Sequence, residues 1–176
     1  LSIDEVKTLG ELKISDSNPF VERARDLFLF SCYTGLRYSD AVNLKWGDIK
    51  SNPDRIELKI IKTSKPLLIP LIPKAKEILE KYSKLTIRVD SQKVLPQMAN
   101  QVVNRNLKDI MKLAGINKNI SFHCSRHSFA SNLVELRVPL VYVKDLLGHQ
   151  KIEQTMIYAK SLEGDLFDSM KMLNEM

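Results

Sequence analysis

The chain has 176 residues, of which 44% are hydrophobic and 27% charged, a size and composition that fit one globular domain and exclude two full-sized ones. Lys and Arg outnumber Asp and Glu by 27 to 21, and the resulting charge of +6 favours a polyanionic partner such as nucleic acid. No apolar run approaches the roughly 20 residues of a membrane span, and no signal-peptide pattern opens the chain, so we expect a cytoplasmic protein.

The N-terminal part of the chain is predicted to be helical. Ser2 stands three residues before Glu5, the spacing of a capping box that starts a short helix. Residues 21–33 repeat apolar side chains at helical spacing, and Gly35 is typical of a helix end. The next helix is expected within residues 39–46, with Ser39 or Asp40 near its cap, which places Arg37 at the junction of two helices.

A small sheet is predicted in the middle of the chain. Residues 55–61 alternate apolar and charged side chains with the period of a half-buried strand. Residues 62–65 (KTSK) supply a turn, and residues 66–71 the return strand. Pro73 then suits the first position of a helix.

Helices are predicted for the remainder of the chain. Gly115 and Gly148 are expected to end two of them, and the predicted ranges are 97–114, 123–136, 139–147 and 152–159, followed by an amphipathic tail. Cys32 and Cys124 lie within apolar helical patterns and are expected to be free thiols. The predicted fold class is mainly α with a small antiparallel β-sheet, in a single domain.

One cluster of polar residues stands out in the sequence SFHCSRHSF. His123, Arg126 and His127 are spaced i, i+3 and i+4, so they share one face of the predicted helix. A metal site is disfavoured because no Glu follows the first His and the cysteines stand at unrelated positions. Alone, such a pattern is more typical of a partly buried histidine beside a surface arginine.

Four further residues are candidates only in combination. Arg37 alone suits a helix-junction arginine paired with Asp40, and Lys62 a solvated lysine in a turn. His149 follows Gly148, and Tyr158 is expected on a short helix, where it suits an amphipathic plug. Periodicity and spacing do not show that these residues converge.

Five stretches taken in order, TGLRYSDAVNLKW, IIKTSKPLLIPL, HCSRHSFAS, LLGHQ and TMIYA, resemble the catalytic domain of the tyrosine recombinases, or phage-type integrases. The resemblance runs from Leu1 to Tyr158 and implies both fold and reaction. In that family an Arg, a Lys, a His-x-x-Arg pair, a His or Trp and a Tyr surround one scissile phosphate; the matching residues are Arg37, Lys62, His123, Arg126, His149 and Tyr158. Lys65 is the alternative to Lys62, and Asp40 and His127 match supporting positions that orient Arg37 and the helix.

The implied chemistry explains these residue types. Attack on a phosphodiester adds charge to an anion, so Arg37 and Arg126 would supply fixed cations. Tyr158 would be the nucleophile, His123 could accept its proton, the lysine would protonate the leaving 5′-oxygen, and His149 would hydrogen-bond a phosphate oxygen. The product would be a covalent 3′-phosphotyrosine, formed without metal or other cofactor.

The resemblance also implies domain organisation and partners. We expect one catalytic domain over residues 1–176, with a core at 1–158 and an amphipathic tail at 159–176, and an N-terminal DNA-clamping domain absent from this chain. Partners would be double-stranded DNA and other protomers, with the tail docking on a neighbour. The Lys-Thr turn is similar to integrases from mobile elements of Bacteroides-type bacteria, which implies a bacterial protein that associates with the nucleoid when bound to DNA.

Three alternatives stay open at this point. One is a type IB topoisomerase-like enzyme, which shares the phosphotyrosine step but relaxes a single duplex. The second is a catalytically silent DNA-binding domain of the same fold, which the complete set of matching residues disfavours. The third is a generic helical regulator that carries the motifs by chance, which the five ordered motifs leave with little support.

Overall fold

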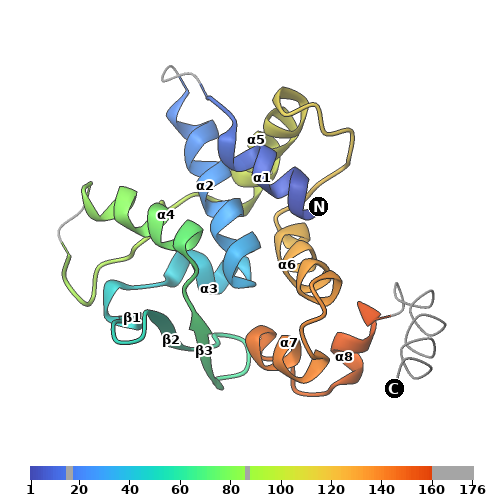
Figure 1. Cartoon of the computed structure of the whole chain (residues 1–176). Helices are drawn as coiled ribbons and strands as arrows, with labels where there is room; N and C mark the ends of the chain where they lie inside the picture. The colour runs from blue at the N-terminus through green and yellow to red at the C-terminus, as the bar shows by residue number, and fades with distance from the viewer. Residues whose placement is uncertain (15–17, 86–87, 160–176) are drawn as a thin grey trace.

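The fold is mostly helical with one small antiparallel sheet, as predicted (Figure 1). The computed structural model describes residues 1–14, 18–85 and 88–159. Its elements are α1 (Ile3–Glu11), α2 (Pro19–Thr34), α3 (Tyr38–Asn43), a 3₁₀ turn η1 (Trp46–Asp48), β1 (Ile49–Lys50), β2 (Arg55–Lys59), β3 (Pro66–Pro70), α4 (Pro73–Ser83), α5 (Asn100–Leu113), α6 (His123–Glu135), α7 (Leu140–Leu147) and α8 (Glu153–Met156). Among the described residues, no helix is long and apolar enough to cross a membrane.

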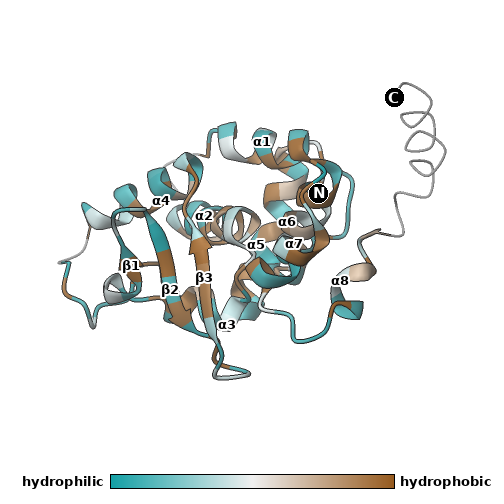
Figure 2. Cartoon of the chain, turned by 60° about the horizontal axis from the view of Figure 1, so that its bottom comes forward, coloured by the Kyte–Doolittle hydropathy of each residue, from teal (hydrophilic) through white to brown (hydrophobic). Residues whose placement is uncertain are grey.

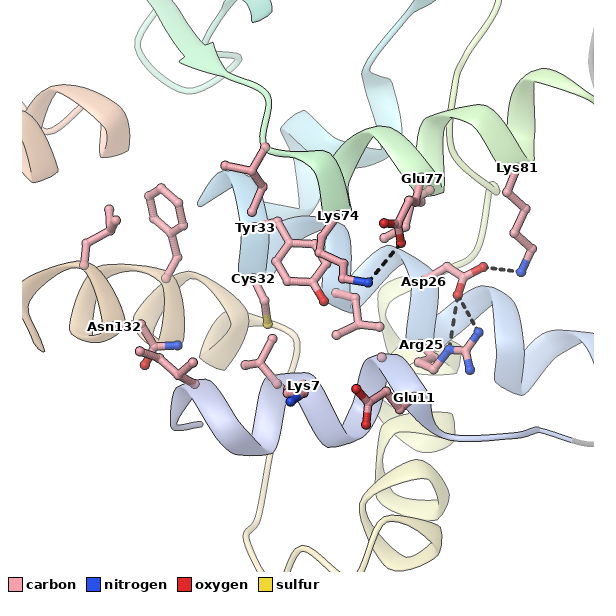
Figure 3. A pocket seen from close by; sticks show the side chains of 18 of the residues that line it. Lys7, Glu11, Arg25, Asp26, Cys32, Tyr33, Lys74, Glu77, Lys81 and Asn132 are labelled. Atoms are coloured by element: carbon pink, nitrogen blue, oxygen red, sulfur yellow. Dashed lines mark hydrogen bonds and ion pairs between the residues drawn. The ribbon is translucent and has the colours of Figure 1, made fainter. Parts of the chain in front are cut away.

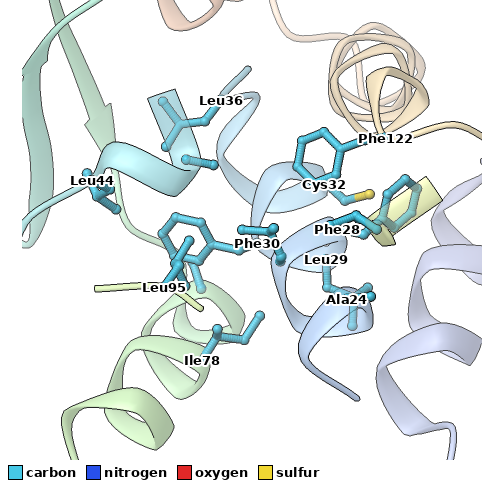
Figure 4. Packing of buried hydrophobic residues seen from close by; sticks show 14 of the residues in the cluster. Ala24, Phe28, Leu29, Phe30, Cys32, Leu36, Leu44, Ile78, Leu95 and Phe122 are labelled. Carbon is cyan, nitrogen blue, oxygen red and sulfur yellow. The ribbon is translucent and has the colours of Figure 1, made fainter. Parts of the chain in front are cut away.

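Helix α2 is the centre of the hydrophobic core. It contacts α1, α3, α4, α5 and α6, and Figure 4 shows its side chains packed on several sides. The sequence pattern predicted one buried face, but Leu29 and Phe30 are buried as well, because neighbouring helices cover α2 almost all round. Phe28 also meets Phe122 edge to face, with the ring centroids 6.2 Å apart. Each such buried side chain contributes on the order of 2 kcal/mol.

The helix ends follow local chemistry. Ser2 and Glu5 form the predicted capping box of α1. Gly35 ends α2 in the left-handed conformation, as expected. Helix α3 starts at Tyr38 with Arg37 in the cap position, so Ser39 and Asp40 lie in its first turn, near the cap as predicted, and the Asp40 carboxylate accepts the Ile61 amide.

The sheet has the order β1-β2-β3, and its register places Ile56 opposite Ile69, both almost fully buried. Figure 2 shows mostly hydrophobic residues along β3. Along β2, hydrophobic and hydrophilic residues alternate. Strand β2 ends before the predicted Ile61, because the Ile61 amide donates a hydrogen bond to Asp40 instead of to the strand ladder. The two-residue strand β1 was not predicted.

The C-terminal helices form a second, smaller core. Phe129 and Val134 of α6 pack with Val143 and Leu147 of α7, and Tyr158 rests against this cluster. Helix α8 is shorter than predicted, so Tyr158 lies in a turn after it. The Tyr158 amide donates a hydrogen bond to the carbonyl of residue 155, three residues earlier, which is the pattern of a 3₁₀ turn. The predicted tail beyond Ala159 lies outside the described residues.

Replacing Gly35 by alanine should destabilise the fold more than the same change at Gly115. Both glycines have positive φ, which costs alanine about 1–2 kcal/mol. A Cβ on Gly35 would also lie 2.6 Å from the Phe129 ring, whereas nothing lies within 4 Å at Gly115. Overpacking should add roughly 1–3 kcal/mol to the loss in Gly35→Ala, measured by urea unfolding. Equal losses of unfolding free energy in the two variants would contradict the close packing at Gly35.

Candidate active site

Arg126 is a buried cation that joins three helices. Its side chain rises from the first turn of α6 and the residue is 4% exposed. Nη1 donates a hydrogen bond to the Gly35 carbonyl at the end of α2 (2.7 Å), and Nη2 donates to the Leu147 carbonyl at the end of α7. No carboxylate among the described residues lies within ion-pair distance of this guanidinium. Burial first, and then the charge of Arg37, lower the Arg126 pKa to about 10.

Arg37 lies beside Arg126 and is incompletely paired. Its Nη1 is buried without a hydrogen-bond partner among the described residues, and it stands 4.0 Å from Oδ2 of Asp40. Oδ1 of Asp40 accepts the Ile61 amide at 3.0 Å. Asp40 therefore connects the arginine at the start of α3 to the β2–β3 turn that carries Lys62.

A cleft of about 340 Å³ opens where α3, α5 and α6 meet. Its lining includes Arg37, His123 and Arg126, together with the small polar residues Ser39, Asn100, Asn104, Ser121 and Ser125. The first turn of α6 lines this cleft, so the positive end of the helix dipole adds to the two guanidinium charges. The cleft is suited to an anion with several oxygen atoms.

Two histidines of α6 and Tyr158 form a row of rings. The His123 and His127 ring centroids are 4.6 Å apart, edge to face, and Nδ1 of His127 lies 2.9 Å from the Tyr158 hydroxyl. Both imidazoles are at the surface, yet partial desolvation and the Arg126 charge lower their pKa values. Partial burial raises the Tyr158 pKa, and Arg126 opposes that rise.

His149 follows Gly148 and is held by Thr155. The His149 Nδ1 lies 2.9 Å from the Thr155 hydroxyl, which is fully buried. Burial first, and then the charges of Arg126 and Arg37, lower the His149 pKa to about 4, so the ring is neutral at neutral pH. Since both arginines act on it, His149 belongs to the same neighbourhood.

The β2–β3 turn lies beside α7 (Figure 1). Gly148 approaches it so closely that a Cβ there would come within 2.4 Å of Cδ1 of Ile60. Lys62 and Lys65 are both exposed on this turn, which is closed by a hydrogen bond from the Ile60 amide to the Lys65 carbonyl.

The structure thus brings three of the six sequence-predicted catalytic residues together in one cleft. Arg37, His123 and Arg126 line it, and His149 lies within range of both arginines. Tyr158 reaches the group through His127. The sequence analysis missed Thr155 and the two carbonyls that hold Arg126, because backbone acceptors and long-range partners leave no local pattern.

A second, larger hollow lies away from this cleft. It measures about 550 Å³ and is formed by α1, α2, α4 and α6 (Figure 3). Apolar side chains such as Leu29 and Leu133 line it, and the buried Asp26 at its side is paired with Arg25 and Lys81. We call it the α1/α6 groove. Within the described residues, no group of His, Cys, Asp and Glu side chains is placed to hold a metal ion.

Comparison with known proteins supplies the family context. The model of the phage integrase family matches residues 1–164. A tyrosine recombinase of Thermosipho africanus (strain TCF52B) is 33% identical over 179 residues, covering 98% of this chain and 61% of the relative. The chain therefore spans less than two thirds of that relative.

Two solved structures have a similar fold. The XerH site-specific recombinase bound to its difH substrate, in a pre-cleavage complex, gives a TM-score of 0.76 at 22% identity, covering 96% of this chain and 52% of that one. The catalytic domain of bacteriophage HP1 integrase gives 0.65 at 22% identity, covering 97% and 92%.

Sulfate should stabilise the wild-type chain through the cleft. An anion that occupies the site at ten times its dissociation constant adds about 1.4 kcal/mol to the free energy of unfolding. Arg37→Ala should abolish this gain, whereas Lys84→Ala, which removes an exposed cation of the same charge at the end of α4, should keep it. Urea unfolding in sulfate and in chloride of equal ionic strength measures both. An equal sulfate effect in the two variants would contradict the anion site.

Proposed function

Because the chain belongs to the phage integrase family, we propose that it cuts and rejoins DNA strands as the catalytic domain of a site-specific recombinase. The family expected from the five motifs is confirmed by the family match and by relatives named tyrosine recombinase. One observation carries the proposal furthest. Within the described residues, the buried guanidinium of Arg126 has no carboxylate partner, and it adjoins Arg37, whose buried Nη1 has no hydrogen-bond partner, at a cleft.

A scissile phosphate fits this pair of cations. Arg37 and Arg126 would bind its non-bridging oxygens, and a well-placed arginine contributes on the order of 10³–10⁵ to the rate of phosphoryl transfer. Arg126 is held by two carbonyls, so its orientation is set before DNA binds. His149, neutral and oriented by Thr155, would donate a hydrogen bond from its free nitrogen to a phosphate oxygen.

Tyr158 would attack the phosphorus. Its pKa is above the usual value of about 10, so fewer than roughly one molecule in 10³ is phenolate at neutral pH. A neutral imidazole of α6 would therefore accept its proton as the bond forms. Lys62, on the turn tied to Arg37 through Asp40, would protonate the leaving 5′-oxygen, with Lys65 as the alternative. The covalent 3′-phosphotyrosine conserves the bond for rejoining.

The domain organisation belongs to the same proposal. Residues 1–158 would form the catalytic core and residues 159–176 a tail. Because the chain spans 61% of its Thermosipho relative, the activity of the whole protein would also need the DNA contacts made by the rest of such a sequence. The origin in a bacterial mobile element stays a prediction.

Two alternatives can be separated by their products. A topoisomerase-like enzyme would relax one supercoiled duplex without joining two. A silent binding domain would bind DNA and form no adduct.

The wild-type chain should form a covalent adduct with DNA through Tyr158. The probe is a library of nicked duplexes with a random core. The nick lets the short 5′-hydroxyl strand leave after cleavage, so the strands cannot rejoin and the adduct is trapped. Denaturing gels should show the adduct in EDTA, since the proposed mechanism uses only side chains of the chain. Tyr158→Phe should abolish it, and Tyr142→Phe, at an exposed tyrosine of α7, should not. DNA binding without an adduct would favour the silent domain.

The partners would include other protomers. The tail pattern sets Leu162, Leu166, Met170 and Leu173 at helical spacing, with acidic residues between them. The α1/α6 groove offers an apolar floor and a rim that includes Lys7 and Lys74 (Figure 3). We propose that the tail of one protomer occupies the α1/α6 groove of another in the working complex.

Truncation of residues 160–176 should reduce the dependence of adduct formation on protein concentration, because the tail would no longer join protomers. Leu136→Asp places a charge in the groove at a residue that is 63% exposed, so it should act in the same way without unfolding the chain. Mixing the two variants should restore part of the concentration dependence, since the intact tail of one variant would then meet the intact groove of the other. Unchanged kinetics in both variants would exclude docking in trans.

A further inference from the structure

The two histidines at the start of α6 face different groups. His123 lines the cleft with Arg37 and Arg126, whereas His127 and Tyr158 are outside that lining. His127 Nδ1 instead lies 2.9 Å from the Tyr158 hydroxyl, within hydrogen-bond distance of the nucleophile. The sequence analysis had given His123 the tyrosine proton and His127 only a supporting role.

We propose that His127, rather than His123, is the catalytic base for Tyr158: its Nδ1 accepts the phenol proton as the bond from the Tyr158 oxygen to phosphorus forms. This inference rests on the proposed function and assigns a task within it. His123 is then left to the phosphate, which matches its place in the cleft lining.

The chemistry of His127 suits this task. A neutral imidazole with its proton on Nε2 presents Nδ1 as an acceptor. Three charged or titratable groups face the ring: His123 and Arg126 on α6, and Tyr158 after α8. Partial desolvation first, and then His123 and Arg126, lower the His127 pKa, which favours the neutral imidazole before reaction. The ring is also exposed, so it can pass the proton on to water.

The atoms and charges balance in this step. The O–H bond of Tyr158 breaks and its proton moves to Nδ1 of His127, which becomes an imidazolium. The phenolic oxygen bonds to phosphorus, the bond from phosphorus to the 5′-oxygen breaks, and that oxygen leaves with the electron pair. The turn lysine supplies its proton. Rejoining reverses each transfer.

The first test uses the free protein and needs no DNA. A Tyr158 hydroxyl that donates to Nδ1 stabilises neutral His127 and lowers its pKa. Tyr158→Phe should therefore raise the His127 pKa. A pH titration of the imidazole by nitrogen-15 NMR measures this pKa in both proteins. A fall would mean that His127 donates to the tyrosine oxygen, and no change would mean that the contact is absent in solution. Either result overturns the proposal.

The second test separates positioning from proton transfer. His127→Asn places an amide oxygen near the position of Nδ1, so it can hold the hydroxyl but cannot take its proton. The substrate is the nicked duplex recovered from the adduct library. The cleavage rate of the wild type should rise with pH through the His127 pKa and then level off. His127→Asn should cleave on the order of 10²-fold more slowly and lose this rise.

His123→Asn is the matched control, because it removes the neighbouring imidazole from the same helix face. It should cleave slowly but keep the rise with pH. Loss of the rise in His123→Asn with its retention in His127→Asn would overturn the assignment, as would an unchanged rate in His127→Asn. If the wild type formed no adduct with any duplex, the proposed function would fail, and the base role with it, whatever the NMR titration gave.

Discussion

The arrangement of this site depends on one buried guanidinium. Arg126 sits in the first turn of α6 and donates to carbonyls at the ends of α2 and α7, so three helices meet at a single side chain. These carbonyls belong to helix ends, where backbone oxygens lack helical partners, and the arginine satisfies them. Arg126 also lines the cleft, and no carboxylate of the described residues forms an ion pair with it. Structure and anion binding thus use the same group.

The surplus positive charge explains the state of the histidines around it. Burial and the two arginines lower the pKa values of His123 and His149, and burial, His123 and Arg126 lower that of His127. Neutral imidazoles can accept or donate a proton at neutral pH, whereas imidazolium rings would add to the repulsion. A bound phosphate would relieve that repulsion, because it would supply the negative charge that the arginines lack.

Contacts outside the cleft hold its residues in place. Asp40 divides its carboxylate between Arg37 and the Ile61 amide, which ties the lysine-bearing turn to the arginine. Gly148 allows α7 to approach Ile60, and His149 follows directly. Each contact joins segments that are far apart in the chain. Small changes at these positions would therefore separate groups that the proposed reaction needs together.

Local sequence was enough for most elements. The capping box at Ser2, the helix ends at Gly35 and Gly148, and the alternation that marks β2 all follow from neighbouring residues, and the structure has them. It was less reliable where a distant group intervened. β2 stops early because Asp40 accepts a hydrogen bond from the Ile61 amide, and α2 is buried beyond its predicted face because five helices contact it.

The sequence by itself determined the family, the fold class and the residue types available for chemistry, because motifs and periodicity are properties of short stretches. It placed His123, Arg126 and His127 on one helical face, since that follows from helix geometry. Only the tertiary structure decided that His123 lines the cleft while His127 meets Tyr158. The physical reason is that a hydrogen bond between residues of α6 and the turn after α8 depends on how α6, α7 and α8 pack, and no local pattern encodes that packing.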